Sequence, residues 1–295
     1  YGDHRDLHKE YRRQRQMCIR DRIDSLLPDT NKIASSMRYS ALADSKCIRA
    51  GLVFASGNLN KEISNSALID MATSIELMHT YSLIHDDLPS MDNDEMRRGQ
   101  ASSHIKFNEA TAILTGDALQ ALAYENIVSS SNITQSQKIS SIKALSNACG
   151  HEGMILGQQY DLDAENNEYN DIKKIHELKT GKLIRVAMTM PHLGNENQKN
   201  QLIVLDEVGR DLGLAFQIID DVLEVSSDSS TLGKSNRSDL VNKKLTYVNT
   251  FGKQASIDQA HALSSACISK LESSFHDNEV TALLELAKFM VERKS

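Results

Sequence analysis

The sequence predicts an all-α fold on three observations. Its 295 residues contain only three prolines and no tryptophan, and 40% of them are hydrophobic, which permits a substantial core. The apolar residues recur at intervals of three and four, the spacing of one face of a helix. No internal repeat or domain-scale linker stands out, so we expect a single helical domain.

The strongest helical signal lies in residues 65–88. Pro89 disfavours helical geometry at the residue before it, so this helix should end near the preceding aspartates, and a loop should carry Asp92 back toward them. An apolar stripe on this helix is formed by Leu68, Met71, Ile75 and Met78. Other helices are expected at 32–57, 107–130, 136–160, 171–192, 201–226, 255–274 and 279–293, and loops at 194–200, 226–243 and 274–278.

Residues 1–22 differ from the rest of the chain. They are rich in arginine and contain few aliphatic side chains. We interpret them as an atypical basic N-terminal arm, solvated or not native to the protein, and place the main domain at residues 23–295. A phosphate-binding or nucleic-acid-binding arm is the alternative.

Composition excludes several classes of protein. The net charge of −7 argues against a general nucleic-acid binder, so an anionic substrate would need local basic groups or a metal. The four cysteines are far apart and form no CxxC pair, which suits reduced thiols in a cytosolic protein. No apolar run approaches the roughly 20 residues that span a bilayer, and no apolar signal segment is visible, so a cytoplasmic location is expected.

Two acidic clusters each end an apolar stretch with helical spacing. The first is His85–Asp92, followed by Arg97 and Arg98; the second is Gln217–Glu224, with Lys234 ten residues further on. Carboxylates this close repel one another, and a divalent cation is an economical counter-charge. For one such pair a solvated helix end is the plain alternative. Two clusters with basic neighbours instead favour magnesium ions that hold a phosphorylated substrate.

These motifs resemble the trans-isoprenyl diphosphate synthases, most closely the bacterial farnesyl diphosphate synthase type, over residues 23–293. The most specific stretch is Ile75–Pro89, which reads IELMHTYSLIHDDLP. The other matching motifs fall in the family's order and spacing. They are Arg97-Arg98-Gly99, Ala112–Gln120, Gly157-Gln158, Asp161–Glu165, Lys179-Thr180-Gly181 and Phe216–Asp221.

The resemblance implies a bundle of antiparallel helices around a deep central cavity, with the aspartate clusters facing each other across its mouth. It also implies three magnesium ions, a homodimer and head-to-tail condensation of isopentenyl diphosphate with dimethylallyl or geranyl diphosphate. Metal and basic groups would neutralise the departing diphosphate, and an apolar cavity would keep water from the carbocation. The released diphosphate is the expected proton acceptor.

Site residues follow from the resemblance by matching position. The expected metal ligands are Asp86, Asp87, Asp92 and Asp220, with Asp221 and Glu224 in support. The expected contacts of the allylic diphosphate are Arg97, Lys179, Thr180, Gln217 and Lys234, with Lys244 a weaker candidate. The expected isopentenyl diphosphate site comprises Lys46, Arg49, His79 and Arg98.

Tyr81 is the candidate for setting product length. It lies five residues before Asp86, about 7.5 Å down a helix, where its ring could form the floor of the cavity. In the family an aromatic residue here, together with the two-residue expansion of the first motif, goes with a C15 product, so farnesyl diphosphate is predicted. For Tyr81 the alternative is a packed core tyrosine. For the product the alternative is C20 geranylgeranyl or C10 geranyl diphosphate.

Three departures from the family pattern keep other functions open. The first basic motif is Asp44–Ala50, in which Cys47 replaces an arginine and the paired glycines are absent; Glu224 replaces an aspartate; and residues 1–22 do not resemble the first helix. A weakly active regulatory subunit of a synthase is therefore a second hypothesis. A terpene cyclase is a third, although Asp220-Asp221 and the basic residues of the isopentenyl site weigh against it.

Overall fold

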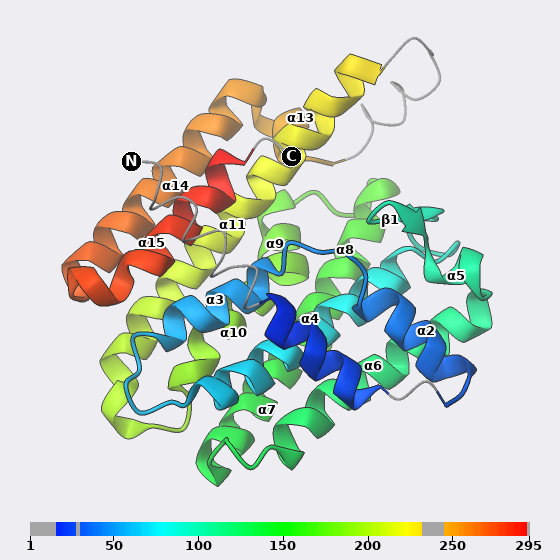
Figure 1. Cartoon of the computed structure of the whole chain (residues 1–295). Helices are drawn as coiled ribbons and strands as arrows, with labels where there is room; N and C mark the ends of the chain where they lie inside the picture. Colours follow the sequence, from blue (N-terminus) through cyan, green and yellow to red (C-terminus); the bar gives the residue numbers. More distant parts are fainter. Residues whose placement is uncertain (1–15, 28–29, 232–244, 294–295) are drawn as a thin grey trace, which may run out of the picture. The chain divides into compact units, whose positions relative to one another are not determined.

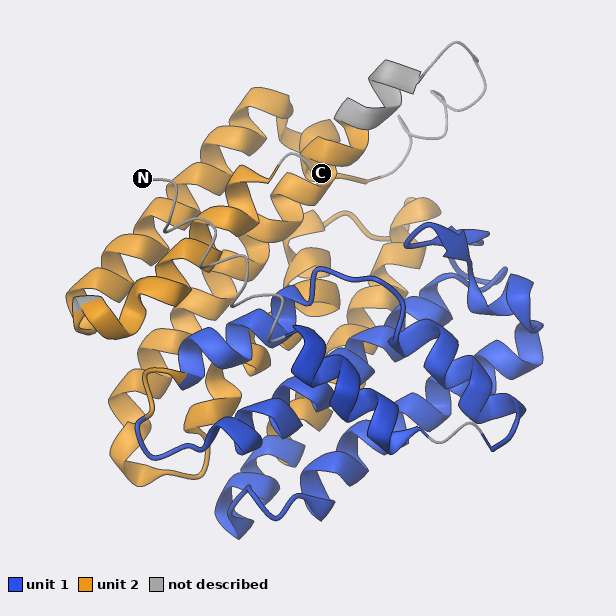
Figure 2. Ribbon diagram, in the orientation of Figure 1, with its two compact units in different colours: residues 1–57, 61–142 blue, residues 58–60, 143–295 orange. Residues whose placement is uncertain are grey.

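The computed structural model describes residues 16–27, 30–231 and 245–293, without the side chains of 226–231 and Asp277. The all-α prediction is confirmed, because the described residues are almost entirely helical and the only strands among them form a two-residue-per-strand hairpin (Figure 1). No helix among the described residues is long and apolar enough to cross a membrane. The chain divides into two compact units, coloured separately in Figure 2.

Unit 1 comprises residues 1–57 and 61–142. Its central helix is α4, and 14 of the 22 residues of α4 are buried, so burial extends beyond the predicted apolar stripe. A helix that is buried on all sides forms the core of its domain, and α4 packs against α2, α3 and α6. The elements after the helix at residues 16–26 are α2 (Lys32–Ala41), α3 (Ile48–Gly57), α4 (Asn65–Asp86), β1 (Met96–Arg97), β2 (Gln100–Ala101), α5 (Ser103–Lys106), α6 (Glu109–Ser129) and the start of α7 (Gln135–Cys149).

Side-chain caps fix where the main helices of unit 1 begin. Ser64 accepts a hydrogen bond from Ala67 N at 3.1 Å at the start of α4. Asn108 does the same for Thr111 N at 2.8 Å at the start of α6. Each cap satisfies one backbone N–H that has no partner within its helix.

Unit 2 comprises residues 58–60 and 143–295. Its longest helix, α11, packs against α10, α14 and α15. The core that these helices enclose includes Ala215, Ile218 and Ile219 of α11. The elements are the end of α7, α8 (Met154–Glu165), α9 (Ile172–His176), the π-helix η1 (Glu177–Gly181), α10 (Lys182–Thr189), the 3₁₀-helices η2 (Met190–His192) and η3 (Glu196–Gln198), α11 (Lys199–Thr231), α13 (Tyr247–Phe251), α14 (Lys253–Ser274) and α15 (Asp277–Glu292).

Several predicted boundaries are wrong. The expected helix 32–57 is two helices, α2 and α3, separated by the loop that carries the first basic motif. The expected helix 136–160 is likewise interrupted, between α7 and α8. The loop expected from residue 226 begins later, because α11 continues to Thr231.

The structure describes only the last part of the predicted N-terminal arm. Residues 1–15 lie outside the described part of the chain, but residues 16–26 form a helix that runs across the expected boundary at residue 22. Ile19 in this helix is buried, whereas Met17, Arg20 and Asp21 are exposed. The division at residue 22 and the single domain 23–295 stay predictions.

Candidate active site

The first acidic cluster lies where α4 ends. Asp87 is the C-cap of α4, and its N–H bonds to Leu83 O. The loop after Pro89 then returns, because Asp92 N donates to Asp86 O at 2.9 Å. The predicted end of this helix and the predicted return of Asp92 are therefore both confirmed. Asp86 is half-buried, Asp87 is buried and Asp92 is exposed.

A tight hairpin brings basic residues to this cluster. Strands β1 and β2 are joined by Arg98 and Gly99, which have φ values of 54° and 79°. Positive φ at both central residues defines a type I′ turn, whose twist matches that of paired strands. The hairpin places Arg97 beside Asp87, since Arg97 Nε donates to Asp87 Oδ1 at 2.9 Å and Nη2 donates to both Asp87 and Asp94.

Burial and pairing act in opposite directions on Asp87 and Arg97. Burial raises the pKa of the Asp87 carboxyl, and the hydrogen bonds and charge of Arg97 offset only part of that effect. For Arg97 burial lowers the pKa, but the hydrogen bond and charge of Asp87 outweigh it and leave the pKa raised. One expected metal ligand, Asp87, and one expected diphosphate contact, Arg97, are thus paired with each other in this structure.

A second basic group lies beside α4, around His79, about two helical turns before the acidic cluster. Arg49 Nη1 is 3.1 Å from His79 Nε2, and because guanidinium can only donate, this imidazole nitrogen accepts. Burial, followed by the charges of Arg49 and Arg98, holds the pKa of His79 well below its usual value. His79 is therefore neutral here, and the positive charge of this group is carried by its arginines. Lys46, expected in the same group, has an exposed side chain in the neighbouring loop.

The carboxylate of Glu76 lies beside this basic group, and sequence reasoning did not include it among the site residues. Its side chain is buried, and Oε1 accepts a hydrogen bond from Ala50 N at 2.9 Å in the first turn of α3. Burial raises the pKa of Glu76, and the charges of Arg49 and Arg98 oppose this. The signal that could have found it is a lone carboxylate within the apolar run Ile75–Met78.

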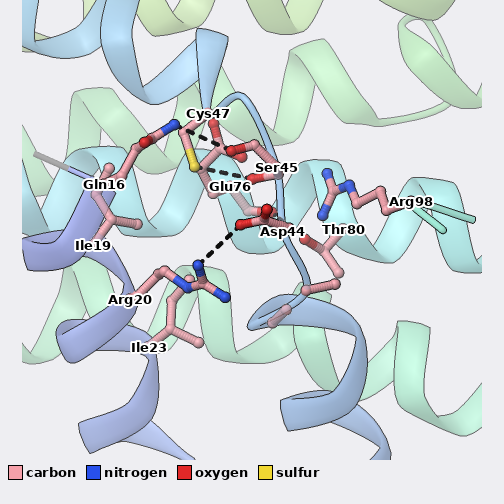
Figure 3. A pocket seen from close by; sticks show the side chains of 12 residues that line it. Gln16, Ile19, Arg20, Ile23, Asp44, Ser45, Cys47, Glu76, Thr80 and Arg98 are labelled. Carbon is pink, nitrogen blue, oxygen red and sulfur yellow. Dashed lines mark hydrogen bonds and ion pairs between the residues drawn. The ribbon is translucent and has the colours of Figure 1, made fainter. Parts of the chain in front are cut away.

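Figure 3 shows a small pocket beside the first basic motif, lined by Cys47, Glu76, Thr80 and Arg98 among others. Its volume of about 30 Å³ has room for about two water molecules. Cys47 has a φ of 46°, and burial, followed by the charge of Glu76, raises its pKa to about 11. The remaining wall comes partly from Gln16, Ile19 and Arg20, which belong to the segment that the sequence predicts to be atypical, so we assign these three no function.

In unit 2 a π-helix positions two of the expected diphosphate contacts. Lys179 and Thr180 lie in η1, a rare helix form that is frequent at functional sites. Lys179 Nζ donates to Asp161 Oδ2 at 2.7 Å, and Thr180 Oγ1 donates to Gln217 Oε1 at 2.7 Å. Gly157 permits this approach, since a Cβ atom at that position would lie 2.2 Å from the backbone nitrogen of Lys179.

The second acidic cluster lies on α11. Gln217, Asp220 and Glu224 occupy one side of the helix, and Glu224 is exposed. Asp220 Oδ1 accepts from Arg293 Nη2 at 2.6 Å, and the same guanidinium lies 3.8 Å from the centroid of the Phe216 ring. Sequence reasoning missed Arg293, because nothing in the spacing connects it with a residue 73 positions earlier.

Asp221 is directed away from that side of α11. Its buried carboxylate oxygen Oδ2 lies 2.9 Å from His176 Nε2 and accepts a hydrogen bond from Tyr247 N at 2.6 Å. These contacts tie α11 to α9 and to the first turn of α13. The expected supporting role of Asp221 at a metal stays a prediction, but its Oδ2 atom already anchors neighbouring helices. Lys234 and Lys244 lie outside the described residues.

The two clusters offer the oxygen donors that suit a magnesium ion. Within the described residues, no group of three or more His, Cys, Asp or Glu side chains is arranged to hold a metal. Magnesium takes only one or two protein carboxylates and completes its shell with water and substrate phosphate oxygens. The carboxylates of Asp86, Asp87, Asp92 and Asp220 therefore fit by chemistry. The clusters belong to different units, so their predicted meeting across a cavity stays a prediction.

Comparison with known proteins gives consistent results. The family model described as polyprenyl synthetase matches residues 30–286. Farnesyl diphosphate synthase of Haemophilus influenzae is 38% identical over 270 residues, which are 89% of this chain and 89% of that protein. Geranylgeranyl pyrophosphate synthase 7 of Arabidopsis thaliana, described as chloroplastic, is 34% identical over 94% of this chain and 82% of its own length.

A solved structure has the same fold. Geranyltransferase from Helicobacter pylori, complexed with magnesium and isoprenyl diphosphate, matches with a TM-score of 0.77 at 30% identity. The match covers 94% of this chain and 95% of that chain, so the predicted fold is confirmed.

Proposed function

The chain belongs to the polyprenyl synthetase family and is a prenyltransferase, and on this premise we propose that its product is farnesyl diphosphate. It would condense isopentenyl diphosphate with dimethylallyl diphosphate and then with geranyl diphosphate. The observation that carries the proposal is the arrangement along α4. This helix ends in the acidic cluster and holds a buried aromatic residue, Tyr81, about 7.5 Å below Asp86.

The reaction begins when the carbon–oxygen bond of the allylic diphosphate breaks and diphosphate leaves with the electron pair. Side chains that bind the leaving group accelerate this step when they bind it most tightly after its charge has developed. Arg97, Lys179, Thr180 and Gln217, with Lys234 and Lys244, are the proposed contacts. In this structure, Arg97 and Lys179 are each paired with a carboxylate.

Isopentenyl diphosphate is proposed to bind at Arg49, Arg98, His79 and Lys46. Because His79 is neutral, Arg49 and Arg98 supply the charge and His79 fixes the guanidinium of Arg49. The double bond of isopentenyl diphosphate attacks the allylic cation, and the released diphosphate then takes the proton.

Asp86, Asp87, Asp92 and Asp220 are the proposed magnesium ligands, with Asp221 and Glu224 in support. Bound magnesium would neutralise charge on the diphosphate without proton transfer. The Helicobacter pylori protein that contains magnesium supports this assignment. Three ions, a homodimer and a cytoplasmic location stay predictions.

Product sizing tests the proposal. With geranyl and isopentenyl diphosphates and magnesium, the product should be C15, and diphosphate release should require both substrates. Tyr81→Ala should shift the product to C20 or longer, whereas Tyr81→Phe, which keeps the ring, should still give C15. A C20 product from the unmodified chain would favour geranylgeranyl diphosphate synthase, which the Arabidopsis relative supports.

A second candidate rests on Cys47. This residue stands where the family usually has an arginine, and Asp44 adds negative charge to the same loop. A regulatory subunit with little activity of its own would release almost no diphosphate with any pair of substrates. Cys47→Arg should then restore release, while in an active synthase it should only lower the KM for isopentenyl diphosphate.

A further inference from the structure

We propose that His85 is a positioning residue for product length, because it holds the ring of Tyr81 at the floor of the chain-elongation cavity. The inference rests on the proposed role of Tyr81 and adds a second residue to it. His85 itself does not need to touch the growing chain. It acts by restricting the orientations that the Tyr81 ring can adopt.

The first step is the contact between the two rings. Tyr81 and His85 are four residues apart on α4, and side chains at that spacing lie on the same helix face. Their ring centroids are 5.5 Å apart with an interplanar angle of 90°, a T-shaped pair. This is a preferred geometry for aromatic rings, since the electropositive edge of one meets the electronegative face of the other.

The second step is what holds the imidazole itself. His85 Nε2 lies 3.1 Å from the carbonyl oxygen of Ile113 in α6. A carbonyl can only accept, so Nε2 carries the proton and the plane of the ring is fixed against the neighbouring helix. The imidazole is thus bound at one side to α6 and at the other to Tyr81.

The third step is the absent side chain that makes room for the imidazole. A Cβ atom built at Gly116 of α6 would lie 2.1 Å from His85 Nε2 and 2.5 Å from Cδ2. No real side chain tolerates such distances, so His85 occupies space that only glycine leaves free. Gly116 is therefore a structural requirement for the position of His85 and, through it, for that of Tyr81.

These contacts make a specific prediction about product length. When the imidazole is removed, the Tyr81 ring loses the ring that packs against it, and it can turn more readily away from the elongating chain. The barrier to a further condensation then falls, so the ratio of C20 to C15 product rises. A residue that only stabilises the fold would change the total rate or the thermal stability but leave this ratio unchanged.

His85→Ala is the principal variant, and its product ratio is measured with isopentenyl and geranyl diphosphates. We expect the ratio of C20 to C15 to rise about fivefold, as for the loss of one aromatic edge contact. His104→Ala is the matched control. His104 is a histidine of unit 1 that likewise has a hydrogen bond, to Ser102 at 3.1 Å, although it is more buried than His85, and its loss should leave the ratio unchanged.

Gly116→Ala provides an independent route to the same outcome. Its methyl group should expel the imidazole and raise the ratio as His85→Ala does. In the double variant the methyl group meets no imidazole, so the two effects should not add. If His85→Ala turns over too slowly for sizing, the ratio of the Gly116→Ala enzyme decides by the same criterion.

The outcomes separate this inference from the proposed function. A raised ratio in Tyr81→Ala with an unchanged ratio in His85→Ala and Gly116→Ala would overturn the role of His85 alone. An unchanged ratio in Tyr81→Ala would overturn the role of Tyr81 and, with it, that of His85. Additive effects in the double variant would also contradict the proposed coupling.

Discussion

His79 should make the fold sensitive to acid, and the size of the effect can be worked out. Burial and the charges of Arg49 and Arg98 hold its pKa well below 6.5, whereas in the unfolded chain it has its ordinary value. As the pH falls below 6.5, the unfolded chain takes up a proton at this residue and the native state does not. The native state therefore loses stability as the pH falls below 6.5, by at most about 2 kcal/mol between pH 8 and pH 5, the limit reached when native His79 stays unprotonated throughout.

His79→Gln removes this contribution and keeps an acceptor for Arg49 in its side-chain oxygen. Urea unfolding of both proteins at pH 8 and pH 5 gives four free energies of unfolding. We expect the variant to lose less free energy of unfolding than the unmodified protein over that range, by up to about 2 kcal/mol. Other titrating groups cancel in the comparison, since both proteins contain them.

Arg49→Met tests the contribution of charge, which is smaller than that of burial, to the lowered pKa of His79. Without this cation the pKa of His79 should rise toward its ordinary value, which the imidazole proton resonance would report directly. Identical acid sensitivity of the unmodified protein and His79→Gln would refute the argument. So would an imidazole that titrates near 6.5 in the unmodified protein.

Three further predictions follow from individual contacts. The raised pKa of Cys47, about 11, should slow its alkylation by iodoacetamide at pH 8 about a hundredfold relative to the unfolded chain, measured by mass spectrometry. Gly157→Ala should destabilise the protein by about 1–3 kcal/mol in urea unfolding, because its Cβ meets backbone of the π-helix; Gly181→Ala, with its nearest atom at 3.4 Å, should not. Arg293→Met should strengthen magnesium binding about fivefold in calorimetry, because it removes the cation that competes for Asp220 Oδ1 and this partly exposed pair is worth about 1 kcal/mol.

Helix positions could be predicted from spacing, but several interruptions could not. The loop between α2 and α3 contains no glycine or proline, and the apolar spacing continues through it, so residues 32–57 resemble one helix. The π-helix leaves no sequence signal, because it differs from an α-helix only in its hydrogen-bond register. Residues 226–231 contain serine, threonine and aspartate, which favour loops, yet α11 continues through them.

Within the site, local relations could be predicted and distant ones could not. The return of Asp92 to Asp86 follows from Pro89 and a six-residue separation. The pairing of Asp220 with Arg293 and that of Asp221 with His176 join residues 73 and 45 positions apart. Helical periodicity specifies a face but not its neighbour, so these tertiary pairs had no signal in one sequence.

Several expected ligands of the site are already paired within their own units. Asp87 is held by Arg97, Asp220 by Arg293, and Lys179 by Asp161. Separating one of these pairs without offering new partners leaves an unpaired charge, and the cost of that charge rises with its burial. Neither component of a magnesium–diphosphate complex can displace the pairs alone without this cost.

The two components together avoid that cost. The cation can take the carboxylate while the freed arginine or lysine takes a diphosphate oxygen, so every charge exchanges one partner for another. We therefore expect magnesium alone and inorganic diphosphate alone to bind weakly in calorimetry, and the mixture to bind at least tenfold more tightly than either. Equal affinity for magnesium with and without diphosphate would contradict this exchange of partners, because a preformed metal site would gain nothing from the anion.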